Sequence, residues 1–209
     1  MAALAISPPP QQARSRATRR RLLRACVACL VERGLAGTTT SEVCRRAGVS
    51  QGALFKHYPT KDALLAAAVE DLFASLVADY RRGLASVSES EDRVRAAVRL
   101  LWQIMRRPTL QAVFELMGAG RCDPALRRAL EAVQIRHREN LSAAARELFP
   151  QVPGDAAEFD AMLDVVISAM QGASLGALVL SDAASDAKRL EALTALARRV
   201  LGERGKKRK

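Results

Sequence analysis

One glycine constrains the fold of this chain more than any other residue. Gly48 separates two short amphipathic segments, residues 40–47 and 51–57, at a point where the chain must turn sharply. Thr39 lies three residues before a glutamate, which is a capping-box pattern, and Ser50 is a typical N-cap. The spacing therefore predicts two short helices joined by a turn of about three residues, which is a helix-turn-helix.

The rest of the chain has the pattern of an all-α protein. Apolar residues make up 49% of it and aromatic residues only 4%, so helix formers dominate and strand formers are scarce. Apolar positions recur at intervals of three and four residues on both sides of the helix-turn-helix, which indicates further amphipathic helices. About nine helices are expected in all. Ahead of the helix-turn-helix, one helix ends near residue 33. After it, helices are expected over roughly residues 61–84, 91–107, 109–117, 124–148, 155–180 and 181–201.

Positive charge is concentrated at the start of the chain. The formal net charge is +11, and residues 1–62 carry +8 of it, residues 200–209 carry +4, and residues 63–199 carry −1. A generally basic proteome would explain a high isoelectric point but not the near-neutral middle of the chain. A basic first module on a neutral body favours a polyanionic partner for that module.

Several classes of protein are not indicated by the sequence. The N-terminal stretch is unlike a secretory signal, and no apolar run approaches the ~18 residues that a membrane helix needs, so a cytoplasmic protein is expected. No P-loop, dinucleotide-binding glycine run, nucleophile elbow or metal-ligand cluster is found, so we expect no enzyme, cofactor or metal site. Cys26 and Cys29 form a C-x-x-C pair that we interpret as core, with a redox or metal role left open.

A run of residues in the first module matches the pattern of a known family. The matching residues are Gly34, Gly37, Thr38, Thr39, Val43, Ala47, Gly48, Val49, Ser50, Gly52, Ala53, Leu54, Phe55, His57, Tyr58 and Lys61. With them, residues 19–65 resemble the TetR family of bacterial regulators, and the likeness extends over roughly residues 16–75. Two positions depart from the family pattern: Cys44 stands where alanine is usual, and Phe55 where tyrosine is common. Because Phe55 has no hydroxyl with which to bond a phosphate, its expected role is packing or contact with thymine methyl groups.

The resemblance implies a sequence-specific DNA-binding regulator that reads the duplex with residues 51–57. Gln51 can pair with adenine in the major groove, and the small side chains of Gly52 and Ala53 let the backbone approach the bases. Lysine, histidine and hydroxyl side chains around them can reach phosphates or base edges. The residues expected to contact DNA are Thr39, Ser50, Gln51, Gly52, Ala53, Phe55, Lys56, His57, Tyr58 and Lys61.

In that family the C-terminal helices bind a ligand and form a dimer, so the resemblance implies both for residues 85–202. A homodimer is also favoured because one short reading helix offers too little specificity, and two-fold pairs read palindromic half-sites. Glu115 and His137 are the polar residues of interest in this half. The expected pocket residues are Trp102, Met105, Phe114, Met117, His137 and Met162. The expected dimer residues are Ala169, Gly172, Ala173, Gly176, Leu190, Leu193, Leu196 and Val200, with intramolecular core as the alternative for both sets.

The predicted organisation has four parts. They are a disordered basic arm (1–15), the helix-turn-helix domain (16–62) with a connecting helix over about 61–84, an effector-binding and dimerisation domain (85–202), and a basic tail (203–209). The expected function is a repressor released from a palindromic operator by a small apolar ligand. An activator, a regulator without a ligand, and a nonspecific DNA-coating protein are the alternatives, and the near-neutral C-terminal half disfavours the last.

Overall fold

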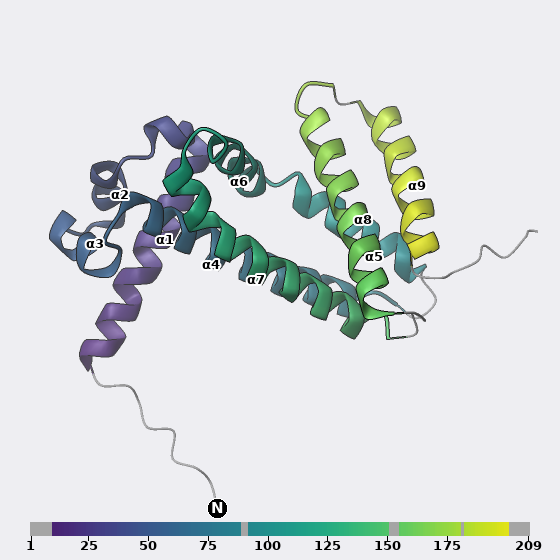
Figure 1. The fold of residues 1–209 in the computed structure, drawn as a ribbon, viewed down its shortest axis with the longest axis horizontal. Coiled ribbons are helices and arrows are strands. Elements are labelled where there is room, and N and C mark those ends of the chain that lie inside the picture. The colour runs from purple at the N-terminus through teal and green to yellow at the C-terminus, as the bar shows by residue number, and fades with distance from the viewer. Residues whose placement is uncertain (1–9, 89–91, 151–154, 181, 201–209) are drawn as a thin grey trace, which may run out of the picture. The chain divides into compact units, whose positions relative to one another are not determined.

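A computed structural model describes residues 10–88, 92–150, 155–180 and 182–200, and every regular element in these ranges is a helix (Figure 1). The predicted all-α class is confirmed for this part of the chain. The helices are α1 (Pro10–Gly37), α2 (Thr40–Ala47), α3 (Gln51–His57), α4 (Lys61–Ala85), α5 (Arg93–Met105), α6 (Pro108–Ala119), α7 (Pro124–Leu148), α8 (Ala156–Gly176) and α9 (Ala183–Val200).

The start of α1 differs from the sequence prediction. The helix begins at Pro10, so residues 10–15 are helical, although the sequence placed them in a disordered arm. Proline is tolerated in the first turn of a helix because its missing N–H would have no helical partner there, and the glutamine, alanine and arginine residues that follow are good helix formers. The rest of the predicted arm (residues 1–9) and the predicted tail (203–209) lie outside the described residues.

The end of α8 also differs from the prediction. The helix stops at Gly176 rather than near residue 180. The chain then continues in tighter turns, in which the Leu178 N–H donates to the Leu175 carbonyl at 3.1 Å and the Val179 N–H donates to the Gly176 carbonyl at 3.3 Å. These three leucine and valine side chains are exposed, so no apolar packing extends the helix.

The described residues pack into two compact units. The first contains the chain up to Asp71 together with residues 112–133, and the second contains residues 72–111 and the chain from 134 onward. The helices α4, α6 and α7 each contribute residues to both units. Residues 112–133 are expected from the sequence in the C-terminal domain, whereas they pack with the first unit. Whether the functional domains follow the predicted limits stays a prediction.

The first unit has a small apolar core that α1, α2, α3 and the start of α4 share. Leu22, Cys26, Leu54 and Leu64 are almost completely buried in it. α1 packs on α2, and α2 packs on α3, as Figure 1 shows. Helices as short as α2 and α3 are marginal on their own, so this shared core holds them in place.

The end of α1 is tied to two other helices of the first unit. Gly34 has φ 64° and ψ −176°, a conformation essentially restricted to glycine, and it bends the helix where the sequence predicted a stop. The Leu35 N–H donates to Glu115 Oε1 at 3.1 Å, and the Leu35 carbonyl accepts from Lys61 Nζ at 3.4 Å. The Thr38 hydroxyl donates to the Gly34 carbonyl at 2.7 Å. Side chains of α6 and α4 therefore hold the bend.

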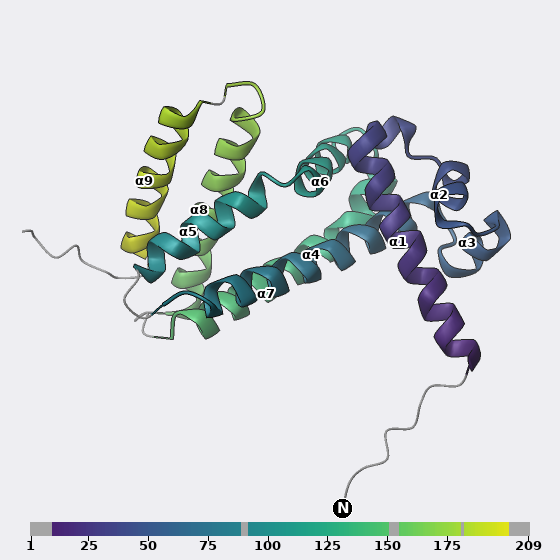
Figure 2. The ribbon, with the colours of Figure 1, turned by 180° about the vertical axis from the view of Figure 1, so that it is seen from behind.

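The second unit is a bundle in which α5, α8 and α9 pack on one another, with α8 and α9 side by side (Figure 2). α4 and α7 meet in the same unit. There the Phe73 ring stacks on His137 with centroids 3.7 Å apart, and Arg81 Nη2 donates to Glu147 Oε2 at 2.7 Å. No helix in the described ranges is long and apolar enough to cross a membrane.

The cysteines of the first unit behave as core residues. Cys26, Cys29 and Cys44 are buried, and burial raises the pKa of the Cys26 thiol to about 12. Metal binding and thiol redox chemistry need the thiolate, which this shift disfavours. Among the described residues no group of three or more His, Cys, Asp or Glu could hold a metal ion. The burial and the raised pKa support the interpretation of the C-x-x-C pair as core.

Candidate functional site

The turn between α2 and α3 has the geometry that the sequence predicts. The exposed Thr39 caps α2, because its hydroxyl oxygen accepts a hydrogen bond from the Glu42 N–H at 3.2 Å. Gly48 ends α2 in the left-handed conformation, with φ 64° and ψ 44°. The exposed Ser50 caps α3 by accepting from the Ala53 N–H at 3.2 Å. Both predicted caps are confirmed, and α3 follows α2 after a turn of three residues.

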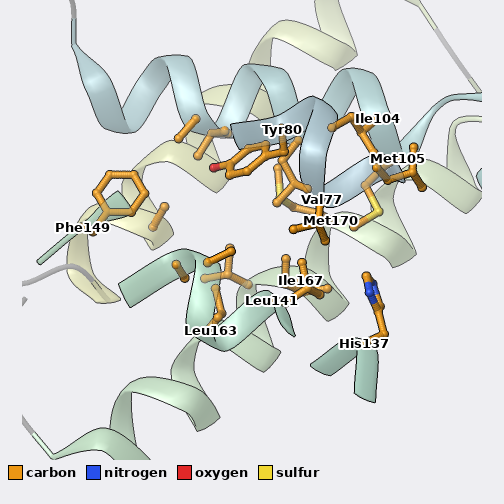
Figure 3. A pocket seen from close by; sticks show the side chains of 18 of the residues that line it. Val77, Tyr80, Ile104, Met105, His137, Leu141, Phe149, Leu163, Ile167 and Met170 are labelled. Carbon is orange, nitrogen blue, oxygen red and sulfur yellow. The ribbon is translucent and has the colours of Figure 1, made fainter. Parts of the chain in front are cut away.

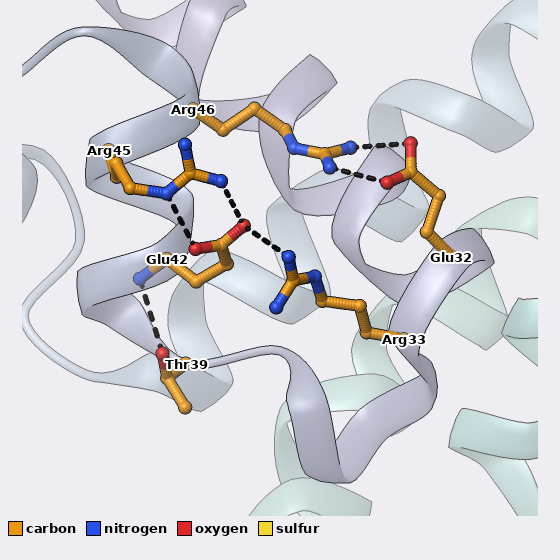
Figure 4. Close-up of polar contacts among 6 residues, drawn as sticks. All are labelled: Glu32, Arg33, Thr39, Glu42, Arg45 and Arg46. Carbon is orange, nitrogen blue, oxygen red and sulfur yellow. Dashed lines mark hydrogen bonds and ion pairs between the residues drawn. The ribbon is translucent and has the colours of Figure 1, made fainter.

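Ion pairs join α2 to α1 beside this turn (Figure 4). The Glu42 carboxylate accepts from Arg45 Nε at 2.8 Å and lies 3.4 Å from Arg33 Nη2 of α1. Arg46 binds Glu32 of α1 with both of its terminal nitrogens. The hydrogen bonds from Arg45, with the other guanidinium groups, lower the pKa of Glu42 to about 2, so this carboxylate stays charged. No local sequence pattern predicts these pairs.

α3 presents a mixed polar and apolar face to solvent. Gln51, Gly52 and Lys56 are exposed, and Phe55 is 46% exposed. The Gln51 amide donates to the Ser41 hydroxyl at 2.6 Å, so α2 orients this side chain. An exposed phenylalanine on a polar helix has apolar surface available to a partner rather than a place in the core of the unit.

The other residues expected to contact DNA are more enclosed. Tyr58 is only 4% exposed, and its hydroxyl accepts from Arg19 Nε at 3.5 Å. Lys61 is half-buried and donates to the carbonyl at the end of α1 described above. Ala53 and His57 are half-buried. The DNA contacts of all these residues stay predictions, but Tyr58 and Lys61 have intramolecular partners that the sequence did not reveal.

An apolar cavity of about 110 Å³ lies within the second unit (Figure 3). Most of its lining comes from α4, α5, α7 and α8, with Leu110 added from α6 and Ala197 from α9. Tyr80 and His137 are the two lining residues with polar side-chain groups, and the lining contains no Asp, Glu, Lys or Arg.

The cavity includes part of the pocket predicted from the sequence. Met105 and His137 line it. Phe114 and Met117 belong to the portion of α6 that packs in the first unit, which removes them from the cavity. The predicted pocket residues outside the lining are Trp102, Phe114, Met117 and Met162. Trp102 is buried on α5, whereas Met162 is 37% exposed on α8.

His137 is neutral and lacks a partner for one ring nitrogen. Its ring stacks on Phe73 at an interplanar angle of 10°, and its Nδ1 is buried without a hydrogen-bond partner in the described part of the chain. Burial lowers the pKa of His137 to about 4 and raises the pKa of Tyr80 well above its usual value. Both polar groups of the cavity are therefore uncharged at pH 7.

Comparison with known proteins identifies the family. The model of bacterial regulatory proteins of the tetR family matches residues 22–68, which contain the whole helix-turn-helix. The HTH-type transcriptional regulator BetI of Paraburkholderia phymatum is 30% identical over 134 residues, which are 62% of this chain and 68% of the relative. The chain belongs to the TetR family. This TetR-family chain is therefore a helix-turn-helix transcriptional regulator, and not an enzyme.

Other similar proteins agree with this assignment. An HTH-type transcriptional regulator of Mycobacterium tuberculosis is 28% identical over 186 residues, covering 89% of this chain and 95% of the relative. A TetR-family regulator from a Rhodococcus species has a similar fold, with a TM-score of 0.69 at 21% identity over 89% of this chain and 99% of that one. The likeness therefore extends through the helices that follow the DNA-binding region.

The dimer residues predicted for this TetR-family regulator include an exposed stripe of α8. Gly172 and Gly176 are exposed, and a Cβ added at either would meet nothing within 4 Å beyond its own stretch of helix. Val165, on the same face, is 59% exposed. Ala169 and Ala173 are half-buried.

On α9 the predicted dimer residues are more enclosed. Leu193 is 6% exposed, and Leu190 and Leu196 are half-buried, so these side chains pack largely within the protomer. The side chain of Val200 lies outside the described residues. The dimer assignment of both helices stays a prediction.

Two further features of the TetR-family chain were not predicted from the sequence. Glu115, singled out for the ligand-binding half, binds the Leu35 N–H in the first unit, which no local pattern indicates. Phe73 and Tyr80 line the cavity although neither was expected there. Their spacing of seven residues on the apolar face of the predicted helix 61–84 is the signal that could have found them.

Proposed function

We propose that this TetR-family regulator is a repressor that binds a palindromic operator as a homodimer and leaves it when a small, mostly apolar ligand occupies the cavity. Because the protein would act on chromosomal DNA, we propose that it works in the cytoplasm. The exposed face of α3 carries the DNA-binding part of the proposal, because Gln51, Phe55 and Lys56 project there from a helix whose start is capped. A short helix of this kind can enter the major groove.

The distribution of positive charge supports DNA binding by the first unit. Residues 1–62 carry a net charge of +8, and the guanidinium-bearing residues in the first half of α1 are exposed. Exposed cations of this kind neutralise phosphates and make binding depend on salt concentration. The exposed arginines are Arg14, Arg16, Arg19, Arg20, Arg21 and Arg24.

The exposed stripe of α8 supports a homodimer. Val165 is 59% exposed and Met162 is 37% exposed, and they lie one helical turn apart. Further along the same face, Gly172 and Gly176 would let a second helix approach closely. A two-fold copy of the same stripe would cover this apolar surface and set two α3 helices on the two halves of a palindrome.

Ligand release would act through helices that continue from the cavity into the first unit. Phe73 and Lys61 belong to the same helix, α4, and Leu110 and Glu115 belong to α6. A ligand that favours an arrangement of these helices unsuited to the operator would weaken operator binding. A coupling of about 1–3 kcal/mol corresponds to a loss of roughly 5- to 150-fold in operator affinity.

Selection of bound DNA from a random duplex pool, followed by competition, tests the DNA-binding part. The selected operator should be palindromic and should resist random duplex at a large excess. Gln51→Ala should relax preference at one base position of each half-site, whereas Lys61→Ala should weaken binding to all sequences and lower the salt dependence. Lys188→Ala, at an exposed residue of α9, is the matched control for the loss of one lysine. Equal displacement by random duplex would instead indicate a nonspecific DNA-coating protein.

Sedimentation analysis tests the dimer. Val165→Arg should convert the protein to a monomer and weaken operator binding, because a charge would be buried in the proposed interface. Ile135→Arg, at a residue 55% exposed on α7, is the control and should leave the dimer intact. A dimer unaffected by Val165→Arg would place the interface elsewhere. Transcription measured with and without ligand then separates a repressor from an activator or a ligand-independent regulator.

A further inference from the structure

We infer that the cavity of the second unit takes a neutral apolar molecule the size of one ring, with a single hydroxyl group that hydrogen-bonds the imidazole of His137. This chemical class rests on the proposed function, because the cavity is taken there as the effector site. The size, the polar atoms and the charges of the lining each limit the ligand in a different way.

The size of the cavity limits the ligand to about one ring. Its volume is about 110 Å³. For comparison, an engineered apolar cavity of about 150 Å³ stays dry and binds benzene. The lining is aliphatic and aromatic apart from two residues, so a ring fills the space without leaving unpaired polar groups of its own. Fused ring systems would need the helices to move apart.

One unpaired polar atom of the lining identifies the end at which a ligand hydroxyl would lie. Of the lining residues, His137 has a buried side-chain atom without a hydrogen-bond partner, Nδ1, and the Tyr80 hydroxyl is not such an atom. Gln134 Nε2, Gln111 Oε1 and Arg81 Nε are also unpaired in the described part of the chain, but their residues do not line the cavity. A hydroxyl both donates and accepts, so it can bond Nδ1 in either neutral tautomer of the ring.

The second polar group lies at a different part of the cavity. Figure 3 shows the Tyr80 hydroxyl pointing toward Phe149, whereas the His137 imidazole lies on the side of Met105. A ring whose hydroxyl reaches His137 would therefore rest among the apolar side chains between the two polar groups. Tyr80 supplies a natural control for the assignment, because replacing it by phenylalanine removes only its hydroxyl.

The charges near the cavity exclude ions. The lining has no ionisable side chain other than Tyr80 and His137, and both are neutral at pH 7. Of the charged residues next to Tyr80 in the chain, Asp79 accepts from Arg107 Nη1 at 2.6 Å, and Arg81 pairs with Glu147 through Nη2, whereas Arg81 Nε is buried without a partner in the described part of the chain. Arg93 acts electrostatically on Tyr80 but does not line the cavity. An anion or a cation in the cavity would lose its hydration and find no counter-charge in the lining.

Four probes of similar shape test the inference: phenol, toluene, benzoate and benzyltrimethylammonium. Binding to the full-length protein without DNA is followed at pH 7.5 by calorimetry and by the fluorescence of Trp102. This residue is the single tryptophan of the chain and is buried on α5, which also lines the cavity. Phenol and toluene should bind, and the two ions should not. His137→Leu should lower the ratio of phenol to toluene affinity by about five- to tenfold, the value of one hydrogen bond.

Two controls keep the assignment of His137 falsifiable. Tyr80→Phe should leave the phenol-to-toluene ratio unchanged, and retained toluene binding shows that a variant still has its cavity. If His137→Leu does not fold, the imidazole ¹⁵N resonances of the unaltered protein are followed instead, and phenol but not toluene should shift those of His137. Equal binding of benzoate or the ammonium probe overturns the inference. So does a ratio, or a set of resonances, that is insensitive to His137.

Operator affinity measured separately distinguishes this inference from the proposed function. If phenol binds with the expected selectivity but leaves operator affinity unchanged, ligand release is wrong and the ligand class of the cavity stands. If a charged probe releases the operator and competes with toluene, ligand release stands and the ligand class is wrong.

Discussion

The Leu35 N–H donates a hydrogen bond to the Glu115 carboxylate at 3.1 Å, across 80 residues of chain. The bond lies beside the Gly34 bend, where an added Cβ would come within 3.0 Å of the same carboxylate oxygen. Lys61 binds the carbonyl of the same leucine. One peptide segment at the end of α1 is thus held by α6 and α4 together.

Loss of the Glu115 carboxylate should destabilise the first unit. Glu115→Ala removes the acceptor and should lower the free energy of unfolding by about 1 kcal/mol, whereas Glu115→Gln keeps an acceptor oxygen and should cost less than half of that. Urea denaturation measures both. Glu131→Ala, at an exposed site on α7, is the matched control and should be neutral. Equal losses for all three variants would mean that the bond to Leu35 contributes nothing.

The two glycines with positive φ should respond differently to alanine. Both have φ 64°, but Gly48 has the ψ of a left-handed helix, 44°, and Gly34 has ψ −176°. Gly48→Ala should cost about 1–2 kcal/mol of backbone strain. No steric clash adds to this cost, because the new Cβ would meet only Arg21, at 4.0 Å. Gly34→Ala should cost at least ~1 kcal/mol more, because its backbone region is essentially restricted to glycine and Glu115 crowds the site.

Asparagine extends this comparison, because it tolerates the left-handed helical region better than other residues that carry a Cβ. Gly48→Asn should recover part of the stability lost in Gly48→Ala, and Gly34→Asn should recover none. Denaturant midpoints at constant m-value provide the measurement. A recovery at Gly34 comparable to that at Gly48 would show that the bend relaxes to another conformation.

The sequence predicted what depends on neighbouring residues. The caps at Thr39 and Ser50 and the turn at Gly48 involve residues at most four apart, and the structure contains all three. It could not predict contacts between distant segments, such as Glu115 with Leu35 or Arg46 with Glu32, because no local pattern selects those partners. Periodicity placed buried residues on one face of each helix, but it did not say which of those faces surround the cavity.

Stability should fall as the pH is lowered from 6.5 to 4 because of His137. The pKa of His137 is about 4 in the folded protein against 6.5 for an exposed histidine. Between these values the unfolded chain binds a proton that the folded chain does not, so stability rises with pH across this window. The total effect is at most roughly 3 kcal/mol.

Denaturation of the wild type and of His137→Gln at pH 7.5, 5.5 and 4.5 measures the effect of His137. The variant should lose less stability than the wild type between pH 7.5 and 4.5, since the other titrating groups are common to both proteins. Parallel pH profiles would contradict a neutral, buried imidazole.

Glu42 should make the stability of the protein depend on pH in a second, more acidic range. Its pKa is lowered to about 2 by the hydrogen bonds from Arg45, against 4.5 in an exposed chain. The stabilisation from the carboxylate is therefore present above pH 4.5 and is lost as the pH falls toward 2. Glu42→Gln should be less stable than the wild type at pH 7, and the difference should shrink at pH 3. Glu191→Gln, at an exposed site on α9, should show no such dependence.

Under the proposed function, the early start of α1 has a consequence for the length of DNA that the protein covers. Residues 10–21 form about 18 Å of helix ahead of the first buried leucine, at a rise of about 1.5 Å per residue. Base pairs repeat every ~3.4 Å along the duplex, so a rigid arm of this length matches about five of them. An arm of that reach would extend the nuclease footprint at each end of the site, and trimming it would shorten the footprint while leaving the sequence read by α3 unchanged.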